Sequence, residues 1–332
     1  MSLREIGKKL KVSRFTVARV LREDRYVSEK TRALVLDYLK KEPYAPNIHS
    51  ARLLSGKINV LGLLFFGGGL FSMEPYVQEI IKGVSEAAKK EGYQVMLFTQ
   101  DKFNSFECLN TYLNKSVSGF ILPAIGKDNY KDVLGLQDKK VPLVLLCSHL
   151  KDLSSFDCDN VTGGYLATKY LLDSGRKRIA FIHGHKNWVD AEDRFRGYKK
   201  ALQEADKQVI IEYVQYNDDN NHVNYEKLAI ERLLSLKEPP DAVFAANDRM
   251  ALAAMSAIKQ AGRDIPKDIA VIGFDNIPSC ENFSPSLSTI SQPVKDMAFA
   301  AAETLIKNVI PQGKNKDYTR FFEPKLVIRK ST

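Results

Sequence analysis

Arginine side chains recur along one face of the segment 13–22, SRFTVARVLR, close to the start of the chain. Ser13 is a favoured N-cap residue, so a helix can begin directly after it. Helical periodicity turns three apolar residues of this segment inward: Val17, Val20 and Leu21. The outward face then carries Arg14, Phe15, Ala18, Arg19 and Arg22. Guanidinium groups at this spacing can bind phosphates, and side chains near the start of such a helix can reach the edges of bases.

The preceding segment, 2–12, predicts a second short helix that packs against the first. Ser2 and Glu5 fit a capping box, and apolar residues follow at helical spacing at positions 3, 6 and 10. Gly7 is small enough to let the other helix approach, and the turn falls at Lys11 and Val12. Two short helices around a tight turn indicate a helix-turn-helix, whose second helix enters the major groove of DNA.

In this motif the N-terminal residues of the second helix lie on base edges. We therefore predict that Arg14 and Phe15 read bases. Ser13, Thr16 and Arg19 would set the register through the DNA backbone, and Arg22 extends the same cationic face. The alternative, from these residues alone, is an amphipathic helical hairpin with a solvated charged face.

The positive charge of the chain is concentrated at its N-terminal end. Residues 1–58 hold 14 Lys and Arg against 6 Asp and Glu, whereas the rest of the chain holds 35 against 34. The 332 residues are otherwise of ordinary globular composition, 44% hydrophobic and 27% charged, and this length suggests roughly two to three domains. Nearly all of the net charge of +9 therefore lies on the helix-turn-helix segment, which predicts DNA binding that weakens steeply with salt.

Several classes of protein do not fit this sequence. No run of about 18 apolar residues predicts a membrane span, and the charged N-terminal segment is unlike a signal peptide, so we expect a cytoplasmic protein. The cysteines are scattered without CxxC spacing, which favours reduced thiols: Cys108, Cys147, Cys158 and Cys280. His183 and His185 form an HxH pair without a third ligand nearby, so we predict no metal site and no cofactor.

Segment 27–39, VSEKTRALVLDYL, predicts a third helix that is capped by Ser28 and completes a small head. The residues expected to pack on the first two helices are Ala33, Leu34, Leu36 and Leu39. After two prolines, segment 48–54 predicts a short helix that ends at Gly56. A lone helix of this length is marginal in water, so it should order only with support from DNA or from a second copy. The alternative is a flexible linker.

From Asn59 the pattern changes to short apolar strands that alternate with amphipathic helices, which is typical of parallel sheets. The first set of strands is expected at 59–66, 94–99, 118–122 and 141–146, with a helix at 75–93. The second set is expected at 178–182, 209–216, 241–246 and 269–274, with helices at 161–174, 190–205, 222–236 and 248–261. Ligands bind at the carboxyl ends of such strands, and two facing halves form a cleft that can close by hinge motion.

Taken together, these segments resemble the lactose-repressor/galactose-repressor (LacI/GalR) family of bacterial transcription regulators, nearly from end to end. The matching stretches include VSRFTVARVL, YAPNIHSARLL, DCDNVTGGYLATKYLLDSGRKRIAFIHG, PPDAVFAANDRMALAAMSAIKQAGRDIPKDIAVIGFDN and LVIRKST. The resemblance implies an all-α helix-turn-helix head at 1–45, a hinge helix at 46–58 and an α/β, periplasmic-binding-protein-like (type I) body with two parallel-sheet subdomains. These subdomains are expected at 59–156 with 288–317 and at 157–287 with 318–332.

The resemblance also implies a sequence-specific DNA-binding regulator, in our interpretation a repressor of a catabolic operon. Two chains would form a homodimer, so that two heads read a pseudo-palindromic operator in double-stranded DNA. The hinge residue Leu54 would insert into the minor groove and kink a base step, with Asn47 and Arg52 beside it. The alternative for Leu54 is packing against the body.

For the cleft, the resemblance implies a small-molecule effector, and we favour a sugar that acts as an inducer. Asp275 matches the family's effector-binding aspartate and Arg194 its arginine; the carboxylate can accept hydrogen bonds from hydroxyls, and the planar guanidinium can donate to adjacent oxygens. Further contacts are expected from Asn247, from the ring of Tyr76 and from Trp188, which could stack on a sugar.

The alternatives for these residues are structural roles. Asp275 would cap a turn, Arg194 would be a surface cation, and Trp188 would fill space within its loop. For Asp248, Asp159 and Asn160 we expect positions at helix starts. The chain departs from the family at LLCSH, where Cys147 or Ser148 stands in place of an aspartate, and this departure leaves the identity of the effector open.

Two other classes of protein share some of these features. A solute-binding protein could share the body, but it would have an export signal and no basic head. An enzyme would need a nucleophile with its base, paired carboxylates or a metal site, and the sequence offers no spacing of that kind. We therefore predict a protein that is not an enzyme.

Overall fold

The computed structural model describes residues 3–21, 24, 26–42, 58–66, 75–217, 225–313 and 317–332. It divides into two compact units, Met1–Ile58 and Asn59–Thr332. We call the first unit the head and the second the body. The expected hinge helix at 46–58 lies almost wholly outside the described residues. In the described part, no helix is both long and apolar enough to cross a bilayer.

The head contains three helices, α1 (Leu3–Leu10), α2 (Arg14–Leu21) and α3 (Glu29–Lys41). Its core is small and is built from Ile6, Val17, Val20 and Val35. Ser13 caps α2, because its Oγ accepts a hydrogen bond from the Thr16 N–H at 3.0 Å. The close approach expected at Gly7 is confirmed, since a Cβ added there would lie 2.7 Å from the Val12 carbonyl oxygen.

The buried face of two head helices differs from the prediction. In α2, Ala18 is buried and Leu21 is exposed, the reverse of our expectation. In α3, the residues expected to pack, Ala33, Leu34 and Leu36, are exposed. The stripe that faces the core is Val35 with Tyr38 and Leu39, at i, i+3 and i+4. Apolar residues lie on both sides of α3, so its pattern alone did not fix which face packs.

The body contains two six-stranded sheets. The order in the first is β11-β5-β4-β3-β1-β2, with every pair parallel. Its strands are β1 (Val60–Phe66), β2 (Gln94–Gln100), β3 (Gly119–Pro123), β4 (Leu143–Leu146), β5 (Ser155–Cys158) and β11 (Arg320–Phe322). Its helices are α5 (Pro75–Lys90), α6 (Ser105–Leu113), α7 (Tyr130–Asp138) and α13 (Val294–Thr304), with short turns η2 (Lys127–Asn129), η4 (Leu305–Val309) and α14 (Ile310–Gln312). We call this sheet with its helices the first lobe.

The second lobe contains the sheet β12-β10-β9-β8-β6-β7, in which only the β10–β12 pair is antiparallel. Its strands are β6 (Ile179–His185), β7 (Val214–Asn217), β8 (Ala242–Ala245), β9 (Ala270–Asp275), β10 (Ser288–Ser291) and β12 (Lys325–Val327). Its helices are α8 (Asn160–Asp173), α9 (Val189–Glu204), α10 (Tyr225–Leu234), α11 (Asp248–Gln260) and α12 (Ser279–Asn282), with η3 (Ile211–Tyr213). The predicted fold class is thus confirmed: an all-α head and an α/β body of two lobes with parallel sheets.

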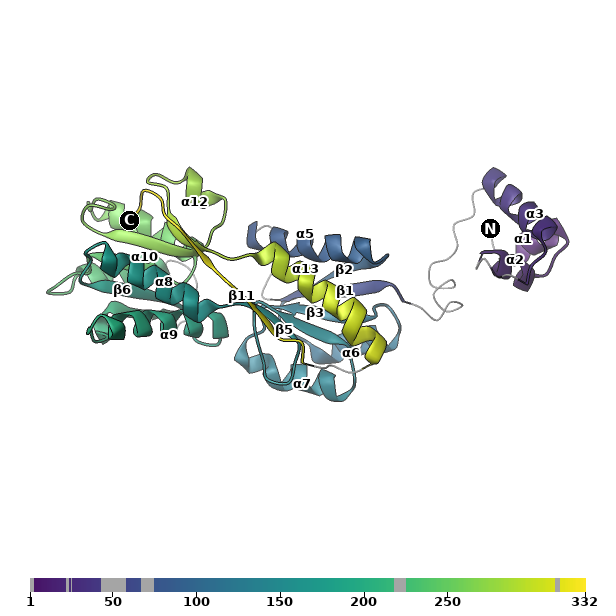
Figure 1. Cartoon of the computed structure of the whole chain (residues 1–332), viewed down its shortest axis with the longest axis horizontal. Helices are drawn as coiled ribbons and strands as arrows, with labels where there is room; N and C mark the ends of the chain where they lie inside the picture. Colours follow the sequence, from purple (N-terminus) through teal and green to yellow (C-terminus); the bar gives the residue numbers. More distant parts are fainter. Residues whose placement is uncertain are drawn as a thin grey trace. The chain divides into compact units, whose positions relative to one another are not determined.

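The chain crosses between the lobes three times, and these crossings correct our expected boundaries. Strand β10 pairs with β9 in the second lobe, although we assigned 288–317 to the first. Strand β11 pairs with β5 in the first lobe, although we assigned 318–332 to the second. Figure 1 shows α13 alongside α5 and β11 alongside β5. Short strands carry little sequence pattern, so their pairing decides to which lobe they belong.

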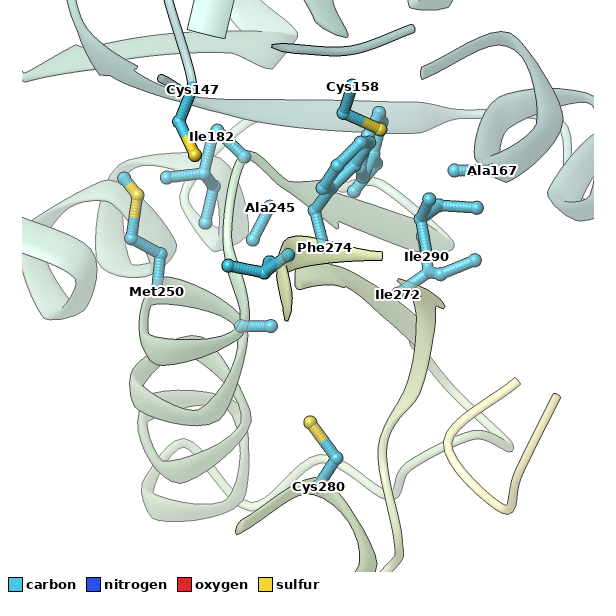
Figure 2. Packing of buried hydrophobic residues seen from close by; sticks show 14 of the residues in the cluster. Cys147, Cys158, Ala167, Ile182, Ala245, Met250, Ile272, Phe274, Cys280 and Ile290 are labelled. Atoms are coloured by element: carbon cyan, nitrogen blue, oxygen red, sulfur yellow. The ribbon is translucent and has the colours of Figure 1, made fainter. Parts of the chain in front are cut away.

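One expected strand begins later than predicted. In the segment 209–216 the strand starts only at Val214, after the 3-10 turn η3, and Ile211 is exposed. The cores of both sheets consist largely of aliphatic strand residues with aromatic side chains between them. Figure 2 shows Phe274 of β9 next to Cys158 of β5 and Ile290 of β10, where strands of the two lobes approach each other. This packing places the end of β9 at the junction of the lobes.

Candidate functional site

A cavity of about 240 Å³ lies where the lobes meet. Its wall includes Tyr76, at the start of α5 in the first lobe, and Asp275, at the carboxyl end of β9 in the second. Gln292 and Pro293, in the crossing after β10, line the same cavity. The structure therefore brings together two of the residues that we predicted to bind an effector.

Asp275 lies in an unusual backbone turn. Its φ is 125° and that of Asn276 is 60°, values that side-chain-bearing residues rarely adopt, so the turn must be held by its surroundings. Gln292 Nε2 donates to Asp275 Oδ1 at 2.7 Å, and Arg329 Nη2 donates to Asn276 Oδ1 at 2.8 Å. Asp248 Oδ2 accepts from the next N–H, that of Ile277, at 2.9 Å. Three separate segments thus fix the position of the carboxylate.

Arg194 lies on α9 and is 4% exposed. Its Nε donates to Asn160 Oδ1 at 2.9 Å, and its Nη1 donates to the Ala246 carbonyl at 2.6 Å. Its Nη2 pairs with Asp190 at 3.1 Å, and its Nη1 is 3.9 Å from Asp275. The guanidinium also lies 3.9 Å from the centre of the Phe274 ring, a cation–π contact. These contacts exclude the alternative of a surface cation.

Two glycines allow the helix pair that presents Arg194 to form. A Cβ added at Gly164 of α8 would lie 2.1 Å from the Arg194 carbonyl oxygen, and one at Gly197 of α9 would lie 2.1 Å from the Val161 carbonyl oxygen. Only glycine lets the backbones of α8 and α9 approach this closely. The close approach brings Asn160 within hydrogen-bond reach of Arg194.

The charges of the site are set mainly by burial. Burial raises the pKa of Asp275 to about 8, although the neighbouring Arg194 opposes this rise. Burial also raises the pKa of the Tyr76 hydroxyl well above its usual value, and Asp275 adds to that rise. Burial therefore favours the neutral forms of Asp275 and Tyr76 in the cavity wall, and the Arg194 guanidinium, which does not itself line the cavity, lies 3.9 Å from Asp275.

A second polar group links the two lobes at His149. This residue follows β4 in the first lobe, and its Nδ1 is 3.0 Å from Oδ2 of the buried Asp157 on β5. Its Nε2 is 3.8 Å from Asp193 on α9 of the second lobe. The hydrogen bond with Asp157 raises the pKa of His149. The preceding Ser148 is 3% exposed, and within the described residues its hydroxyl has no hydrogen-bond partner.

Another contact between the lobes involves the loop before α9. The Lys127 N–H donates to the Asn187 carbonyl at 2.9 Å, and the Asn187 side chain donates to Asp128. Trp188, on the same loop, is 39% exposed and lies near Gly126 of the first lobe. It is not among the residues that line the 240 Å³ cavity, so its stacking on a ligand stays a prediction.

The helix cap that we expected at Asp248 is supplied by its neighbour Asn247. The Asn247 side chain caps α11, since its Oδ1 accepts from the Met250 N–H at 2.8 Å. Asp248 is fully buried and binds Thr289, Cys280 and the Ile277 N–H, so it supports the Asp275 turn. Both residue types are good caps, and adjacent positions cannot be distinguished from sequence alone. An effector contact from Asn247 stays a prediction.

Sequence reasoning missed several residues that complete the site. Asn160 was interpreted as a helix start, and indeed Asp159 caps α8, but Asn160 is buried and orients Arg194. Gln292 and His149 were not singled out. The sequence signal for Gln292 is weak: it is a polar residue directly before a proline, and prolines mark the turns and loops at which strands end.

Neither histidines nor cysteines form a site of their own in the described residues. His183 is fully buried, its ring stacks on Tyr216 with centroids 4.8 Å apart, and its Nδ1 is 2.8 Å from the Gly184 carbonyl. Nowhere in the described ranges are three His, Cys, Asp or Glu side chains grouped so that they could hold a metal ion. All four cysteines are buried free thiols.

In the head, the predicted DNA-binding residues of α2 form one exposed end. Arg14 and Phe15 are exposed, and the Arg14 guanidinium lies 4.8 Å from the centre of the Phe15 ring. Arg19 is exposed and lies 3.9 Å from Asp24. The predictions for Arg22, Asn47, Arg52 and Leu54 fall outside the described residues.

Comparison with known proteins identifies both units. The model of bacterial regulatory proteins of the lacI family matches residues 2–47, and that of the periplasmic binding protein-like domain matches residues 168–332. The HTH-type transcriptional repressor PurR of Histophilus somni (strain 129Pt) is 32% identical over 336 residues, 99% of this chain and 98% of that protein. The ribose operon repressor of Haemophilus influenzae is 30% identical over 337 residues, with the same coverage of 99% and 98%.

Solved structures agree with these sequence matches. The transcriptional regulator CelR in complex with cellobiose superimposes with a TM-score of 0.75 at 29% identity over 100% of both chains. The lac repressor dimer bound to operator and the anti-inducer ONPF superimposes with a TM-score of 0.84 over 100% of this chain and 99% of that one, and at 24% identity this likeness shows the fold alone. The resemblance seen in the sequence is confirmed: the chain belongs to the lacI family of bacterial regulatory proteins and is a transcriptional repressor with a DNA-binding head and a ligand-binding body.

Proposed function

We propose that this repressor binds a pseudo-palindromic operator of a catabolic operon as a homodimer, in the cytoplasm, and that a sugar in the interlobe cleft releases it. One observation carries this proposal: the cavity between the lobes has Tyr76 on one side and Asp275 on the other, with Arg194 within 3.9 Å of Asp275. A ligand that contacts both lobes can favour one lobe arrangement over another, which is the requirement for control by population shift.

Asp275 and Arg194 together suit a pair of neighbouring hydroxyls: one donates to an Asp275 oxygen, which accepts in the neutral as in the ionised form, and the other accepts from the guanidinium. Within the described residues, the contacts of the Asp275 carboxylate use Oδ1, which leaves Oδ2 for a ligand. The cavity of about 240 Å³ lies below the roughly 300 Å³ at which pockets for drug-sized ligands begin, so we infer a ligand the size of a monosaccharide.

A flat nitrogen heterocycle is the second candidate effector. Tyr76 offers a ring for stacking, and a neutral Asp275 carboxyl can both donate to and accept from a heterocycle edge. In either case we propose Asn247 and Trp188 as outer contacts. We also propose that the cleft binds its ligand without turnover, since the named relatives are repressors and transcriptional regulators.

Homodimer formation is supported by exposed apolar side chains at one edge of the first lobe. Strand β2 is the edge strand of its sheet and exposes Met96 and Leu97. The helix that follows, α6, exposes Phe106 and Leu113. An edge strand with apolar side chains needs a cover in solution, and a second copy related by twofold symmetry would supply one.

In DNA binding we propose that Arg14 and Phe15 read bases and that Ser13, Thr16, Arg19 and Arg22 contact phosphates. The hinge residues Asn47, Arg52 and Leu54 would bind the minor groove when two hinges lie side by side.

Two experiments test this function. Native mass spectrometry of the purified protein, mixed with libraries of monosaccharides and of purine-like heterocycles, should identify a retained ligand. Gel shifts on genomic DNA fragments at several salt concentrations should then show a specific site that this ligand releases. If the protein bound all DNA sequences equally, the proposed role as a sequence-specific regulator would be wrong. If a heterocycle rather than a sugar released the DNA, the heterocycle would be the effector. Chemical conversion of the ligand would indicate an enzyme.

A further inference from the structure

His149 lies at the junction of the lobes and faces carboxylates from both of them. Its Nδ1 is 3.0 Å from Oδ2 of Asp157 in the first lobe, and its Nε2 is 3.8 Å from Oδ2 of Asp193 in the second. Both carboxylates are buried. The Phe321 ring packs edge-on against the imidazole, and the Tyr130 hydroxyl donates to the His149 carbonyl oxygen at 3.1 Å, so the residue is held from two further sides.

Only the protonated ring of His149 can donate to both carboxylates. A neutral imidazole has one N–H donor and one bare nitrogen, whereas an imidazolium donates from both nitrogens. When the single proton of the neutral ring lies on Nδ1 and bonds Asp157, the lone pair of Nε2 faces the Asp193 carboxylate. Protonation therefore changes this contact between the lobes from repulsive to attractive.

The charged groups that face the ring lie on β5 and α9. Asp157 belongs to β5, whereas Asp193 and Arg196 belong to α9 and pair with each other. The hydrogen bond with Asp157 raises the pKa of His149 most, and the charge of Asp193 adds to the rise, whereas burial and Arg196 oppose it. Burial raises the pKa of both carboxyls, and Asp190 on α9 adds to that rise. The net effect is a raised pKa for the histidine.

The same contacts connect His149 to the arginine of the proposed effector site. Asp157 Oδ1 accepts from Asn160 Nδ2 at 3.3 Å, and Asn160 Oδ1 accepts from Arg194 Nε at 2.9 Å. Asp193 directly precedes Arg194 on α9. His149 therefore reaches Arg194 by two routes, through the side chains of Asp157 and Asn160 and through the backbone of α9, although it does not line the cavity.

We propose that His149 is a positioning residue of the effector site: its protonated ring joins the two lobes and holds Arg194 in place. This inference rests on the proposed effector function of the cavity and goes beyond it by adding control by pH. The pKa of His149 is raised in the folded protein, so its contribution is complete below the ordinary value of 6.5 and is lost as the pH rises through the folded pKa.

The test follows the lobes directly and uses neither ligand nor DNA. The Lys127 N–H of the first lobe donates to the Asn187 carbonyl of the second at 2.9 Å, so its hydrogen exchange reports separation of the lobes. The Ala124 N–H donates to Leu146 within the first lobe at 2.9 Å and is the internal reference. In the full-length protein, exchange of Lys127 relative to its intrinsic rate should rise about threefold to tenfold between about pH 6 and 8, and that of Ala124 much less.

Two variants assign this response to the histidine. His149→Gln keeps a hydrogen-bonding side chain that cannot be protonated, and at pH 6 its Lys127 exchange should rise toward the wild-type value at pH 8. Asp275 titrates in the same range, so the share of His149 is the difference between wild type and this variant. Asp193→Asn should give a similar rise at pH 6, and the two changes together should have no larger effect than either alone.

The position of Arg194 is measured separately. Its Nε–H is hydrogen-bonded to Asn160, so solvent exchange of this proton, followed by NMR, should be faster in His149→Gln than in wild type at pH 6. Unchanged exchange of the Arg194 Nε–H would show that His149 does not position the arginine and would overturn the inference.

His185→Gln is the matched control. His185 Nδ1 accepts from the Asn187 N–H at 3.3 Å, so its own titration lies next to the reporting contact. The pH response of Lys127 should persist in His185→Gln. A response that vanished there, or that persisted in full in His149→Gln, would overturn the inference and leave the proposed repressor function standing. Loss of the response in His149→Gln and Asp193→Asn alone supports it.

Discussion

The two surfaces that we propose for recognition of DNA and of the effector are built on opposite principles. At the start of α2 in the head, Arg14 and Phe15 are exposed and touch each other. In the cleft of the body, Arg194 is 4% exposed and has four polar partners, and Asp275 lies in a turn held by three segments. The core cluster in the described part of the head has four buried side chains, whereas the body has two six-stranded sheets.

The difference follows from the ligands. DNA brings its own charges and base edges, so the protein can leave donors in water and form their contacts on binding. A small effector offers few groups, and a site that must respond to it needs donors that are already oriented and shielded from water. Substitutions of the exposed residues at the start of α2 should therefore change DNA affinity alone, whereas substitutions around the cavity of the body should also change the free energy of unfolding.

The largest effect is expected from Arg194→Leu. This change removes the partner of the buried Asn160 and of two carboxyls, Asp190 and Asp275, whose side chains are only 25% and 16% exposed, so the free energy of unfolding of the body should fall by about 3–5 kcal/mol. Thermal unfolding followed by the fluorescence of Trp188, the one tryptophan, measures this change in the body. Lys169→Leu on α8 is the control, since both side chains of its ion pair with Asp173 are exposed and its loss should lower the free energy of unfolding by less than about 1 kcal/mol. Equal losses of unfolding free energy in both variants would show that the contacts of Arg194 stabilise the body no more than an exposed ion pair does.

The next largest effect concerns pH. The pKa of Asp275 is about 8 in the folded protein against an ordinary value of 3.8, so between these pH values the folded state holds a proton that the unfolded chain has released. This group therefore makes the body less stable as pH rises from about 4 to 8. Asp275→Asn removes the titration, and the decrease in unfolding temperature between pH 5 and pH 8 should become smaller.

Other buried carboxyls keep part of that pH dependence in the variant, because burial also raises the pKa of Asp157 and of Asp248. Hydrogen exchange of α2 amides in the same samples is the internal control, since the head should respond much less. An unchanged pH slope in Asp275→Asn would show that the carboxyl is ionised in the free protein.

A smaller effect is expected from Arg19→Ala in the head. Loss of one phosphate contact should lower the slope of log affinity against log salt by about 0.9 per head and weaken binding several-fold on every sequence. The unfolding temperature of the body should not change, because Arg19 is exposed. Gel shifts between 50 and about 200 mM salt measure the slope. A lower unfolding temperature of the body in this variant would contradict the expectation that an exposed head residue affects DNA binding alone.

The smallest effect is expected from Lys11→Gly in the turn of the head. Lys11 has a φ of 52°, which glycine adopts without strain. The free energy of unfolding of the head should therefore rise, by less than about 1 kcal/mol. Slower hydrogen exchange of α1 and α2 amides would report the gain. Gly7→Ala places a Cβ 2.7 Å from the Val12 carbonyl oxygen, so this change should destabilise the head and speed the same exchange.

Much of the fold could be predicted because local pattern carries it. The alternation of apolar strands and amphipathic helices located β1, β6 and α9 to within a few residues. Ser13 and Ser28 were correctly predicted as helix caps, since a cap depends on backbone groups only three residues away. The uneven charge distribution indicated a DNA-binding head before any contact was known.

The sequence by itself determined which segments are helices and strands, where the charge lies and to which family the chain belongs, because each depends on residues close together in the chain. Tertiary structure alone decided that Val35 rather than Leu34 or Leu36 faces the head core, and that β10 and β11 lie in opposite lobes from those expected. It also decided that Asn160 orients Arg194, 34 residues away. These outcomes depend on how closely distant backbones can approach, which is a property of packed surfaces rather than of local pattern.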